Sequence, residues 1–146
     1  MKNRTILLVE DNPQDEILTM RALKKINLVN EVDVARDGQQ ALDYLFGEGE
    51  FAARDASEMP AVVLLDIGLP RLSGLEVLER LRAEERTRLL PVVILTSSDD
   101  ERDRLKSYEN GCNSFVRKPV EFAEFAETVA RLGIYWLATN EPPPGK

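Results

Sequence analysis

The chain has 146 residues and is 43% hydrophobic, which is enough to fill the core of one ordinary domain, so two domains are not expected. Its 26 acidic and 19 basic residues give a formal charge of −7, and an acidic chain without a basic stripe is a poor partner for nucleic acid, whose phosphates it repels. There is no histidine and one cysteine, Cys112, which excludes serine–histidine–aspartate catalysis, histidine metal ligands, a phosphohistidine on this chain and an internal disulfide.

Five short runs rich in β-branched residues or leucine alternate with longer stretches of helical period, which predicts strand and helix in turn, five times over. The expected strands are Thr5–Val9, Val32–Ala35, Ala61–Leu65, Val92–Leu95 and Ser114–Val116. No apolar run approaches the roughly 20 residues needed to cross a bilayer. We therefore expect a soluble, cytoplasmic protein without a membrane partner.

The helices are expected to begin at recognisable capping residues. Asn12 before Pro13, and Asp37 before Gly38, are typical of an N-cap and a first helical position. The segments 73–76 (SGLE) and 98–101 (SDDE) both match the reciprocal capping box. The last helix is expected over residues 121–137, with one apolar stripe made of Phe122, Phe125, Val129, Leu132 and Trp136.

Two segments lack periodicity. Residues 47–60 are longer and more polar than a usual connection, so we expect a surface loop there. After Trp136 the chain gains proline, which predicts one domain over residues 1–138 and a flexible tail over residues 139–146. Cys112 is expected to be a small buried apolar residue.

The first, third and fourth strands are apolar throughout, which indicates a parallel sheet covered on both faces. In such sheets functional groups gather beyond the carboxyl ends of the strands, near the point where the strand order reverses. Those ends carry Glu10 and Asp11, then Asp66, then Thr96 and Ser97, and finally Lys118 and Pro119. If the strands are neighbours, three carboxylates meet the hydroxyls at the end of the fourth strand and one ammonium.

Three clustered carboxylates need a cation, because two like charges about 4 Å apart repel by roughly 4 kcal/mol at an effective dielectric near 20. Mg²⁺ fits an oxygen-only ligand set. With the metal in place, Asp66 is the best candidate to attack phosphorus and become an aspartyl phosphate, because it stands alone at the tip of the most apolar strand. Thr96 and Lys118 could then each hydrogen-bond a phosphoryl oxygen.

Each of these residues also has a purely structural interpretation. Asp66, followed by glycine and proline, could cap a turn, and Glu10 with Asp11 could favour the start of the first helix electrostatically. Thr96 could be a turn residue and Lys118 a solvated surface charge. The aromatic residues near the C-terminus favour packing over a ligand site. These residues are Phe122, Phe125, Tyr135 and Trp136.

Four motifs in order resemble the receiver domain of two-component response regulators over about residues 4–137. They are LLVEDN at 7–12, LLDIGLPRLSG at 64–74, PVVILTSS at 91–98 and FVRKP at 115–119. The resemblance implies a flavodoxin-like (βα)5 fold, which is an α/β doubly wound parallel five-stranded sheet with strand order 2-1-3-4-5. It implies that the domain at 1–138 is a receiver and that Asp66 accepts a phosphoryl group from a phosphohistidine on a separate sensor histidine kinase.

The same resemblance assigns the remaining site residues. Asp11, Asp66 and the backbone carbonyl of Gly68 would bind Mg²⁺, and Glu10 would act through a bound water. Lys118 would contact the phosphoryl group. Thr96 would move toward it while Phe115 turns inward, which remodels the surface of the fourth helix, fifth strand and fifth helix. Pro119 would follow a cis peptide bond.

A narrower similarity links the chain to single-domain regulators paired with bacterial phytochromes and related sensor kinases. It rests on EDNPQD at 10–15, the long loop before the third strand, LKSYENGCNSFVRKPV at 105–120 and IYWL at 134–137. It implies a phytochrome as one candidate kinase, and a homodimer through the fourth helix, fifth strand and fifth helix. The chain departs from the pattern at Gly68, where a larger side chain is common, and Ser98 lies at a position that influences hydrolysis, so the phosphoryl lifetime stays open.

Two other classes compete with a phosphorylated receiver. A magnesium-dependent phosphohydrolase of the haloacid dehalogenase type places a second acid two residues after its nucleophile, where this chain has Gly68. A pseudo-receiver keeps the fold and loses the reactive residues, which are all present here. We therefore expect a phosphoacceptor signalling protein, with self-catalysed phosphotransfer and autodephosphorylation as its only chemistry.

Overall fold

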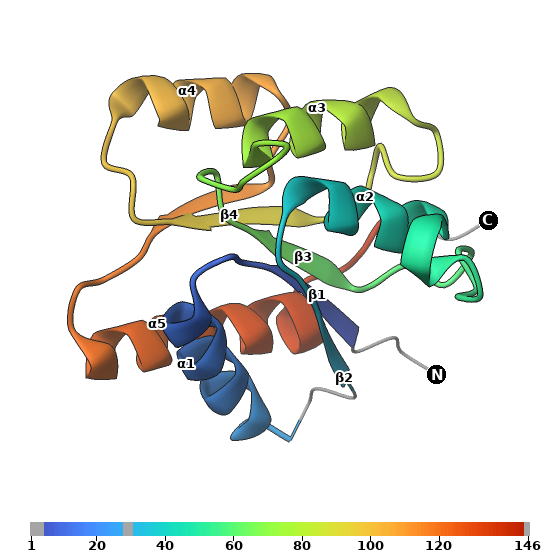
Figure 1. Cartoon of the computed structure of the whole chain (residues 1–146). Helices are drawn as coiled ribbons and strands as arrows, with labels where there is room; N and C mark the ends of the chain where they lie inside the picture. The colour runs from blue at the N-terminus through green and yellow to red at the C-terminus, as the bar shows by residue number, and fades with distance from the viewer. Residues whose placement is uncertain (1–4, 28–30, 145–146) are drawn as a thin grey trace.

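The computed structural model describes residues 5–27 and 31–144. Five strands and five α-helices alternate along them (Figure 1). The strands are β1 (Thr5–Val9), β2 (Glu31–Ala35), β3 (Val62–Leu65), β4 (Val92–Thr96) and β5 (Ser114–Arg117). The helices are α1 (Pro13–Lys24), α2 (Gly38–Phe46), α3 (Gly74–Ala83), α4 (Glu101–Glu109) and α5 (Phe122–Ile134). A π-helical turn, Tyr135–Thr139, continues α5.

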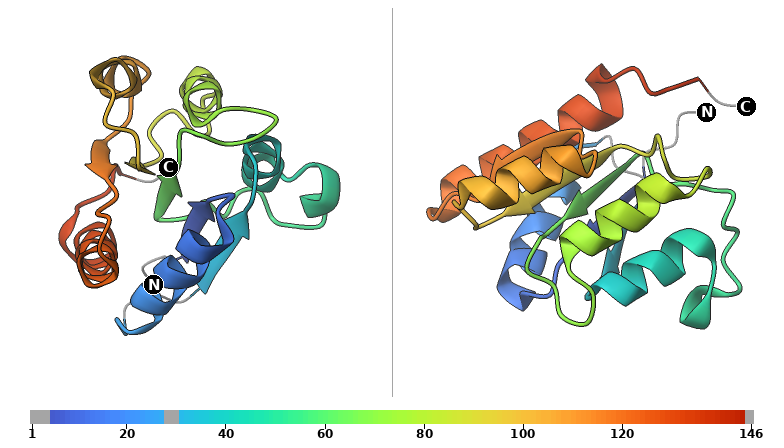
Figure 2. Two further views of the ribbon diagram at one scale, coloured as in Figure 1. Left: turned by 60° about the vertical axis from the view of Figure 1, so that its left-hand side comes forward. Right: turned by 90° about the horizontal axis from the view of Figure 1, so that it is seen from above.

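The strands form one parallel sheet in the order β2-β1-β3-β4-β5, which confirms the predicted doubly wound fold. Helices α1 and α5 cover one face of the sheet, and α2, α3 and α4 lie on the other (Figures 1 and 2). Of the helices in the described residues, none has the length and apolarity that a membrane span requires.

The two faces of the sheet explain why the central strands are apolar at nearly every position. In β1, Leu7 and Val9 pack into the cluster under α2 and α3, whereas Ile6 and Leu8 pack into the cluster under α1 and α5. The four residues of β3 divide between the same two clusters, and each is at most 1% exposed. Burying one such side chain contributes about 1.5–3 kcal/mol, so these strands hold the sheet rigidly at its centre. Cys112 is buried in the first cluster, as predicted.

The predicted helix starts are confirmed for α1, α2 and α3. Asn12 Oδ1 accepts hydrogen bonds from the backbone N–H groups of Gln14 (3.0 Å) and Asp15 (3.2 Å). Asp37 caps α2 by accepting from Gln40 N, at 2.8 Å. Ser73 Oγ accepts from the backbone N–H of Glu76 at 3.2 Å and lies at the same distance from its carboxylate.

The predicted start of α4 is wrong. Asp100, two residues after Ser98, is the N-cap, and its carboxylate accepts from Arg102 N at 2.8 Å. Ser98 Oγ instead donates to the Asp103 carboxylate at 2.7 Å. Aspartate caps a helix as well as serine does, and Asp100 also binds the Arg102 guanidinium, which favours the later start.

The loop over residues 47–60 packs on α2. It begins at Gly47, whose left-handed φ of +66° ends that helix. Phe51 packs edge-on against the ring of Tyr44, and the Arg54 guanidinium lies 3.9 Å from the centre of the same ring. Arg54 also donates to the Tyr44 carbonyl at 2.7 Å, so the loop is held to the rest of the domain.

Two expectations near the C-terminus are corrected. Phe122 is 69% exposed, because it begins α5 beyond the edge of the buried stripe that Phe125 and Val129 continue. The bond between Lys118 and Pro119 is trans, where the resemblance implied cis. An X–Pro bond prefers trans by about 0.5–1 kcal/mol, and Lys118 reaches the interior in this conformation.

Candidate functional site

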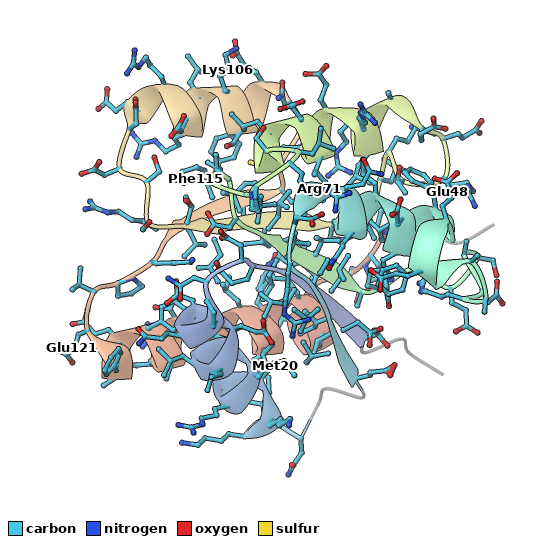
Figure 3. The ribbon with its side chains drawn as sticks, in the orientation of Figure 1. Met20, Glu48, Arg71, Lys106, Phe115 and Glu121 are labelled. Carbon is cyan, nitrogen blue, oxygen red and sulfur yellow. The ribbon has the colours of Figure 1, made fainter. Side chains whose placement is uncertain are left out.

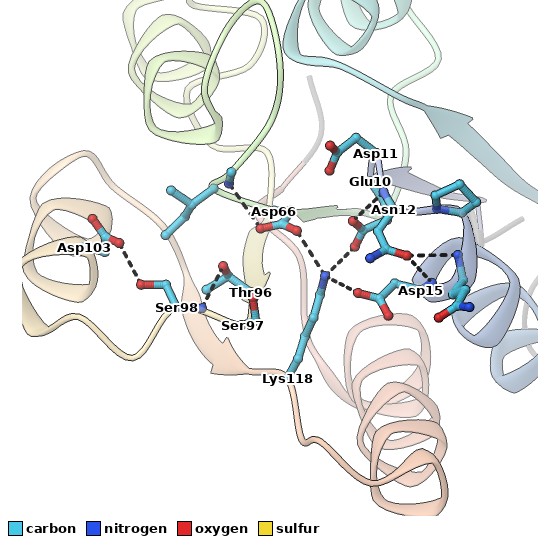
Figure 4. Close-up of a pocket in the computed structure, with 14 residues that line it drawn as sticks. Glu10, Asp11, Asn12, Asp15, Asp66, Thr96, Ser97, Ser98, Asp103 and Lys118 are labelled. Atoms are coloured by element: carbon cyan, nitrogen blue, oxygen red, sulfur yellow. Dashed lines mark hydrogen bonds and ion pairs between the residues drawn. The ribbon is translucent and has the colours of Figure 1, made fainter.

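An open pocket of about 710 Å³ lies at the carboxyl edge of the sheet and is lined by residues from the ends of four strands (Figure 4). It brings together the predicted residues Glu10, Asp11, Asp66, Thr96 and Lys118. The register explains why: Val9 pairs with Leu65, so Glu10 and Asp66 leave neighbouring strands at the same level. The hydrogen bond from Asp66 N to Val9 O, at 3.1 Å, continues the ladder to the site.

Three carboxylates at this edge could hold one cation. One oxygen each of Glu10, Asp11 and Asp66 lies within 4.8 Å of the others, with Glu10 buried, Asp11 exposed and Asp66 between these extremes. A single ion can contact oxygens at this separation, and the all-oxygen set suits Mg²⁺. The residues therefore fit the cation that the sequence predicted.

Gly68 lies beside this group, and its N–H donates to Asp66 Oδ1 at 3.2 Å. A Cβ added at Gly68 would meet no atom within 4 Å, and its φ is outside the left-handed region. The backbone therefore does not require glycine at this position. Its carbonyl as a metal ligand stays a prediction.

Lys118 is the centre of the site. Its side chain is 6% exposed, and Nζ donates to Glu10 Oε1 (2.6 Å), Asp15 Oδ2 (2.9 Å) and Asp66 Oδ2 (3.0 Å). An ammonium has three N–H donors, so three carboxylates satisfy it completely. The interpretation of Lys118 as a solvated surface charge is therefore wrong.

Burial and charge shift the pKa values of this pair. Burial raises the pKa of the Glu10 carboxyl, and the hydrogen bond from Lys118 opposes that shift without cancelling it. Burial alone would lower the pKa of Lys118, but the hydrogen bonds to Glu10 and Asp15 and the charge of Asp66 hold it above its ordinary value. These contacts favour the charged form of Lys118, whose ammonium faces Asp66.

Asp15 was missed by the sequence reasoning. It lies in the first turn of α1, four residues after Asp11, and accepts from Lys118 Nζ. The spacing is a signal that could have found it: the N-cap at Asn12 turns the helix back over the strand end, which places a first-turn side chain above the site.

Thr96 and Phe115 lie on adjacent strands. Thr96 is 3% exposed, and its Oγ1 accepts from Ser98 N at 3.3 Å. Phe115 pairs in register with Ile94 and packs, partly buried, against the cluster under α2 and α3 (Figure 3). Neither contact tests the movement that the resemblance implied for these two residues.

Comparison with known proteins agrees with this geometry. The family described as the response regulator receiver domain matches residues 6–130. Response regulator Rcp1 of Synechocystis is 34% identical over 96% of this chain and 93% of its own length. The Mn²⁺-bound structure of Rcp1 covers 97% of this chain and 99% of its own, with 33% identity and a TM-score of 0.89.

Two further solved structures bear directly on the narrower similarity. The phosphorylated cyanobacterial phytochrome response regulator RcpA has a TM-score of 0.90 at 34% identity, over 97% of this chain and 99% of its own. The bacteriophytochrome response regulator RtBRR is 55% identical over 98% of this chain and 86% of its own, with a TM-score of 0.76. This chain belongs to the response regulator receiver domain family and is related to the regulators of phytochromes.

Proposed function

We propose that this chain is a single-domain response regulator that accepts a phosphoryl group from a sensor histidine kinase onto Asp66 in a Mg²⁺-dependent reaction. The observation that carries the proposal is the convergence of Asp66, Lys118 and the acidic pair Glu10 and Asp11 on one pocket. Its relatives support the chemistry, since one was solved phosphorylated and another with Mn²⁺ bound.

In the proposed reaction, a carboxylate oxygen of Asp66 attacks the phosphorus of a phosphohistidine. A P–O bond forms to Asp66 as the P–N bond breaks, and the imidazole leaves on the kinase. Asp11, Asp66 and the backbone carbonyl of Gly68 would hold Mg²⁺, with Glu10 acting through a bound water, and the ion would supply charge neutralisation at the phosphoryl oxygens. Lys118 stabilises the transferring group from the other side, and the Thr96 hydroxyl, whose oxygen accepts from Ser98 N, donates its own O–H to a phosphoryl oxygen.

The partners follow from the relatives and the surface. A phytochrome is a candidate kinase because RcpA and RtBRR are named as phytochrome regulators. We propose that this signalling takes place in the cytoplasm. The face formed by α4, β5 and α5 is the proposed output and homodimer surface. It exposes Leu105 (61%) and Tyr108 (51%) on α4, next to the strand that carries Phe115.

Intact mass measurement after incubation with Mg²⁺ and acetyl phosphate tests the proposal. The wild-type protein should gain one phosphoryl group, chelation of Mg²⁺ should suppress the gain, and Asp66→Asn should not be labelled. An Asp66→Asn protein that is labelled to the same extent would overturn the assignment of the phosphoacceptor.

A further inference from the structure

The Lys118 ammonium has a third carboxylate partner that the proposed reaction does not use. Asp15 Oδ2 lies 2.9 Å from Nζ, a distance between those of Glu10 and Asp66. Its side chain is 27% exposed, compared with 2% for Glu10 and 12% for Asp66. The cluster that could hold the cation consists of Glu10, Asp11 and Asp66, so Asp15 lies on the lysine side of the site.

The start of α1 fixes Asp15 in this place. Its backbone N–H donates to Asn12 Oδ1 at 3.2 Å, and Pro13 occupies the first helical position. The backbone N–H of Asn12 in turn donates to Glu10 Oε2 at 3.1 Å. Glu10 and Asp15 are therefore linked through Asn12 and hold the lysine from two elements, the end of β1 and the first turn of α1 (Figure 4).

An ammonium on a flexible four-carbon stem has no preferred direction of its own. When two of its three N–H groups are held by Glu10 and Asp15, the third must point along the one remaining direction, which is toward Asp66 Oδ2. Without Asp15, one N–H group is released to solvent, and the ammonium can rotate and shift about the Glu10 contact.

We propose that Asp15 is a positioning residue that aims Lys118 at the phosphoryl group on Asp66. This inference rests on the proposed function. When Asp66 becomes an aspartyl phosphate, the N–H that contacts Asp66 passes to a phosphoryl oxygen, while Glu10 and Asp15 keep the other two. Phosphorylation and autodephosphorylation both pass through a phosphoryl group stabilised by Lys118, so the positioning acts on both rates.

The test compares Asp15→Ala with Asp15→Asn and with Glu16→Ala. Glu16 is the matched control, since it is an acidic residue in the same turn whose carboxylate binds Arg36. At saturating Mg²⁺, intact mass gives the rate of labelling by acetyl phosphate and the rate of label loss after the donor is removed. Asp15→Ala should slow both rates on the order of tenfold. Asp15→Asn keeps an acceptor oxygen and should recover most of the loss, and Glu16→Ala should match the wild type.

A second measurement is independent of turnover. In protein labelled with ¹⁵N-lysine, the ammonium protons of Lys118 should exchange slowly with water, because they are buried and hydrogen-bonded. Asp15→Ala should broaden or abolish their signal, and Asp15→Asn and Glu16→Ala should keep it.

The outcomes separate this inference from the proposed function. An Asp15→Ala protein with wild-type rates and an unchanged Lys118 signal would overturn the positioning role. Asp15→Asn as slow as Asp15→Ala would also overturn it, because charge and not aim would then matter. If the wild type is never labelled, the proposed function fails, whereas the lysine spectrum still reports whether Asp15 orders Lys118.

Discussion

Gly74 lies against the backbone of the proposed phosphoacceptor. A Cβ at this position would be 2.1 Å from Asp66 O and 2.8 Å from Ile67 Cα, and Gly74 N already donates to Ile67 O at 2.9 Å. The first turn of α3 therefore presses on the loop that carries the site. Gly68, six residues earlier, has open space where its side chain would be.

The same substitution should destabilise the protein at Gly74 and have little effect at Gly68. Gly74→Ala should lower the free energy of unfolding by about 1–3 kcal/mol, because backbone atoms cannot yield as a flexible side chain can. Gly68→Ala should change it by less than about 0.5 kcal/mol. Urea unfolding followed by circular dichroism measures both, and equal losses in the two variants would contradict the packing described for Gly74.

Lys118 neutralises the carboxylates of Glu10 and Asp66, which lie close together with little exposure to solvent. Removing it leaves Glu10 and Asp66 side by side without a cation, and breaking a buried ion pair from one side costs about 3–5 kcal/mol. We expect Lys118→Met to lower the free energy of unfolding by about 3 kcal/mol in a chelator. Excess Mg²⁺ should restore much of this loss, because it neutralises the same oxygens.

Urea unfolding with EDTA and with Mg²⁺ measures this effect. Lys106→Met on α4 is the matched control, since Lys106 is exposed and should have little effect in either buffer. A Lys118→Met protein that is as stable as the wild type in EDTA would show that the carboxylates do not need the lysine.

At this scale the sequence predicted most of the site, because strand ends can be read from apolar runs and parallel strands bring their ends to one edge. Glu10, Asp66, Thr96 and Lys118 were found in this way, and the pocket contains them all. Asp15 was not found, because its place in the first turn after the Asn12 cap indicates a position near the site but not its partner, Lys118, which is 103 residues away.

At the scale of elements, apolar continuity and N-caps predicted the centre of the fold better than its margins. Strands β1, β3 and β4 are buried on both faces, and the short apolar runs that this burial requires predicted them. Helix α4 buries one residue, Ser107, and its start depends on local competition between Ser98 and Asp100. A capping-box pattern cannot decide that competition, which depends on where the preceding strand ends.

The contact of α2 with the edge strand β2 gives a prediction on pH. Tyr44 is buried, its hydroxyl donates to Asp33 on β2, and Arg54 of the long loop covers its ring. Burial and the hydrogen bond to Asp33 raise the pKa of Tyr44 to about 12. Because the folded state favours the neutral phenol, the stability this group contributes is fully present below its ordinary pKa of 10.0 and is lost as the pH rises toward 12.

Wild type and Tyr44→Phe should therefore converge in alkali. The phenylalanine variant lacks the hydrogen bond to Asp33 and should be less stable at about pH 9, and the difference should shrink by about 1 kcal/mol by about pH 11. Urea unfolding measures the stability of both proteins across this pH range. The other tyrosines and the lysines titrate in both proteins, so their contributions cancel in the difference. A constant difference would show that Tyr44 titrates as it does in the unfolded chain.

At the scale of the whole molecule, the first turn of α4 joins the site to the proposed output surface, because Asp103 lines the pocket. The pocket lies at the carboxyl ends of the strands, and α4 lies on the sheet face with α2 and α3 (Figures 1 and 2). A chain of hydrogen bonds leads from the end of β4 to α4: Ser98 N donates to Thr96 Oγ1 at 3.3 Å, and Ser98 Oγ donates to the Asp103 carboxylate at 2.7 Å. If Thr96 shifts toward a phosphoryl group as proposed, we expect its contact with Ser98, in the loop before α4, to lengthen.

The proposed homodimer depends on the apolar residues that α4 exposes. Leu105 and Tyr108 lie one turn apart and together form an apolar patch among the charged residues Glu101, Arg102 and Arg104. Leu105→Glu places a charge in the middle of this patch and should weaken self-association at least tenfold, since the carboxylate would have to be desolvated in the interface.

Leu89→Glu is the matched control, because Leu89 is similarly exposed, at 54%, and lies away from α4. Light scattering over a range of concentrations, with and without acetyl phosphate and Mg²⁺, measures the mass of each protein. If the wild type stays monomeric at high concentration under both conditions, the proposed dimer is wrong. If Leu89→Glu dissociates and Leu105→Glu does not, the interface lies at Leu89 and not on α4.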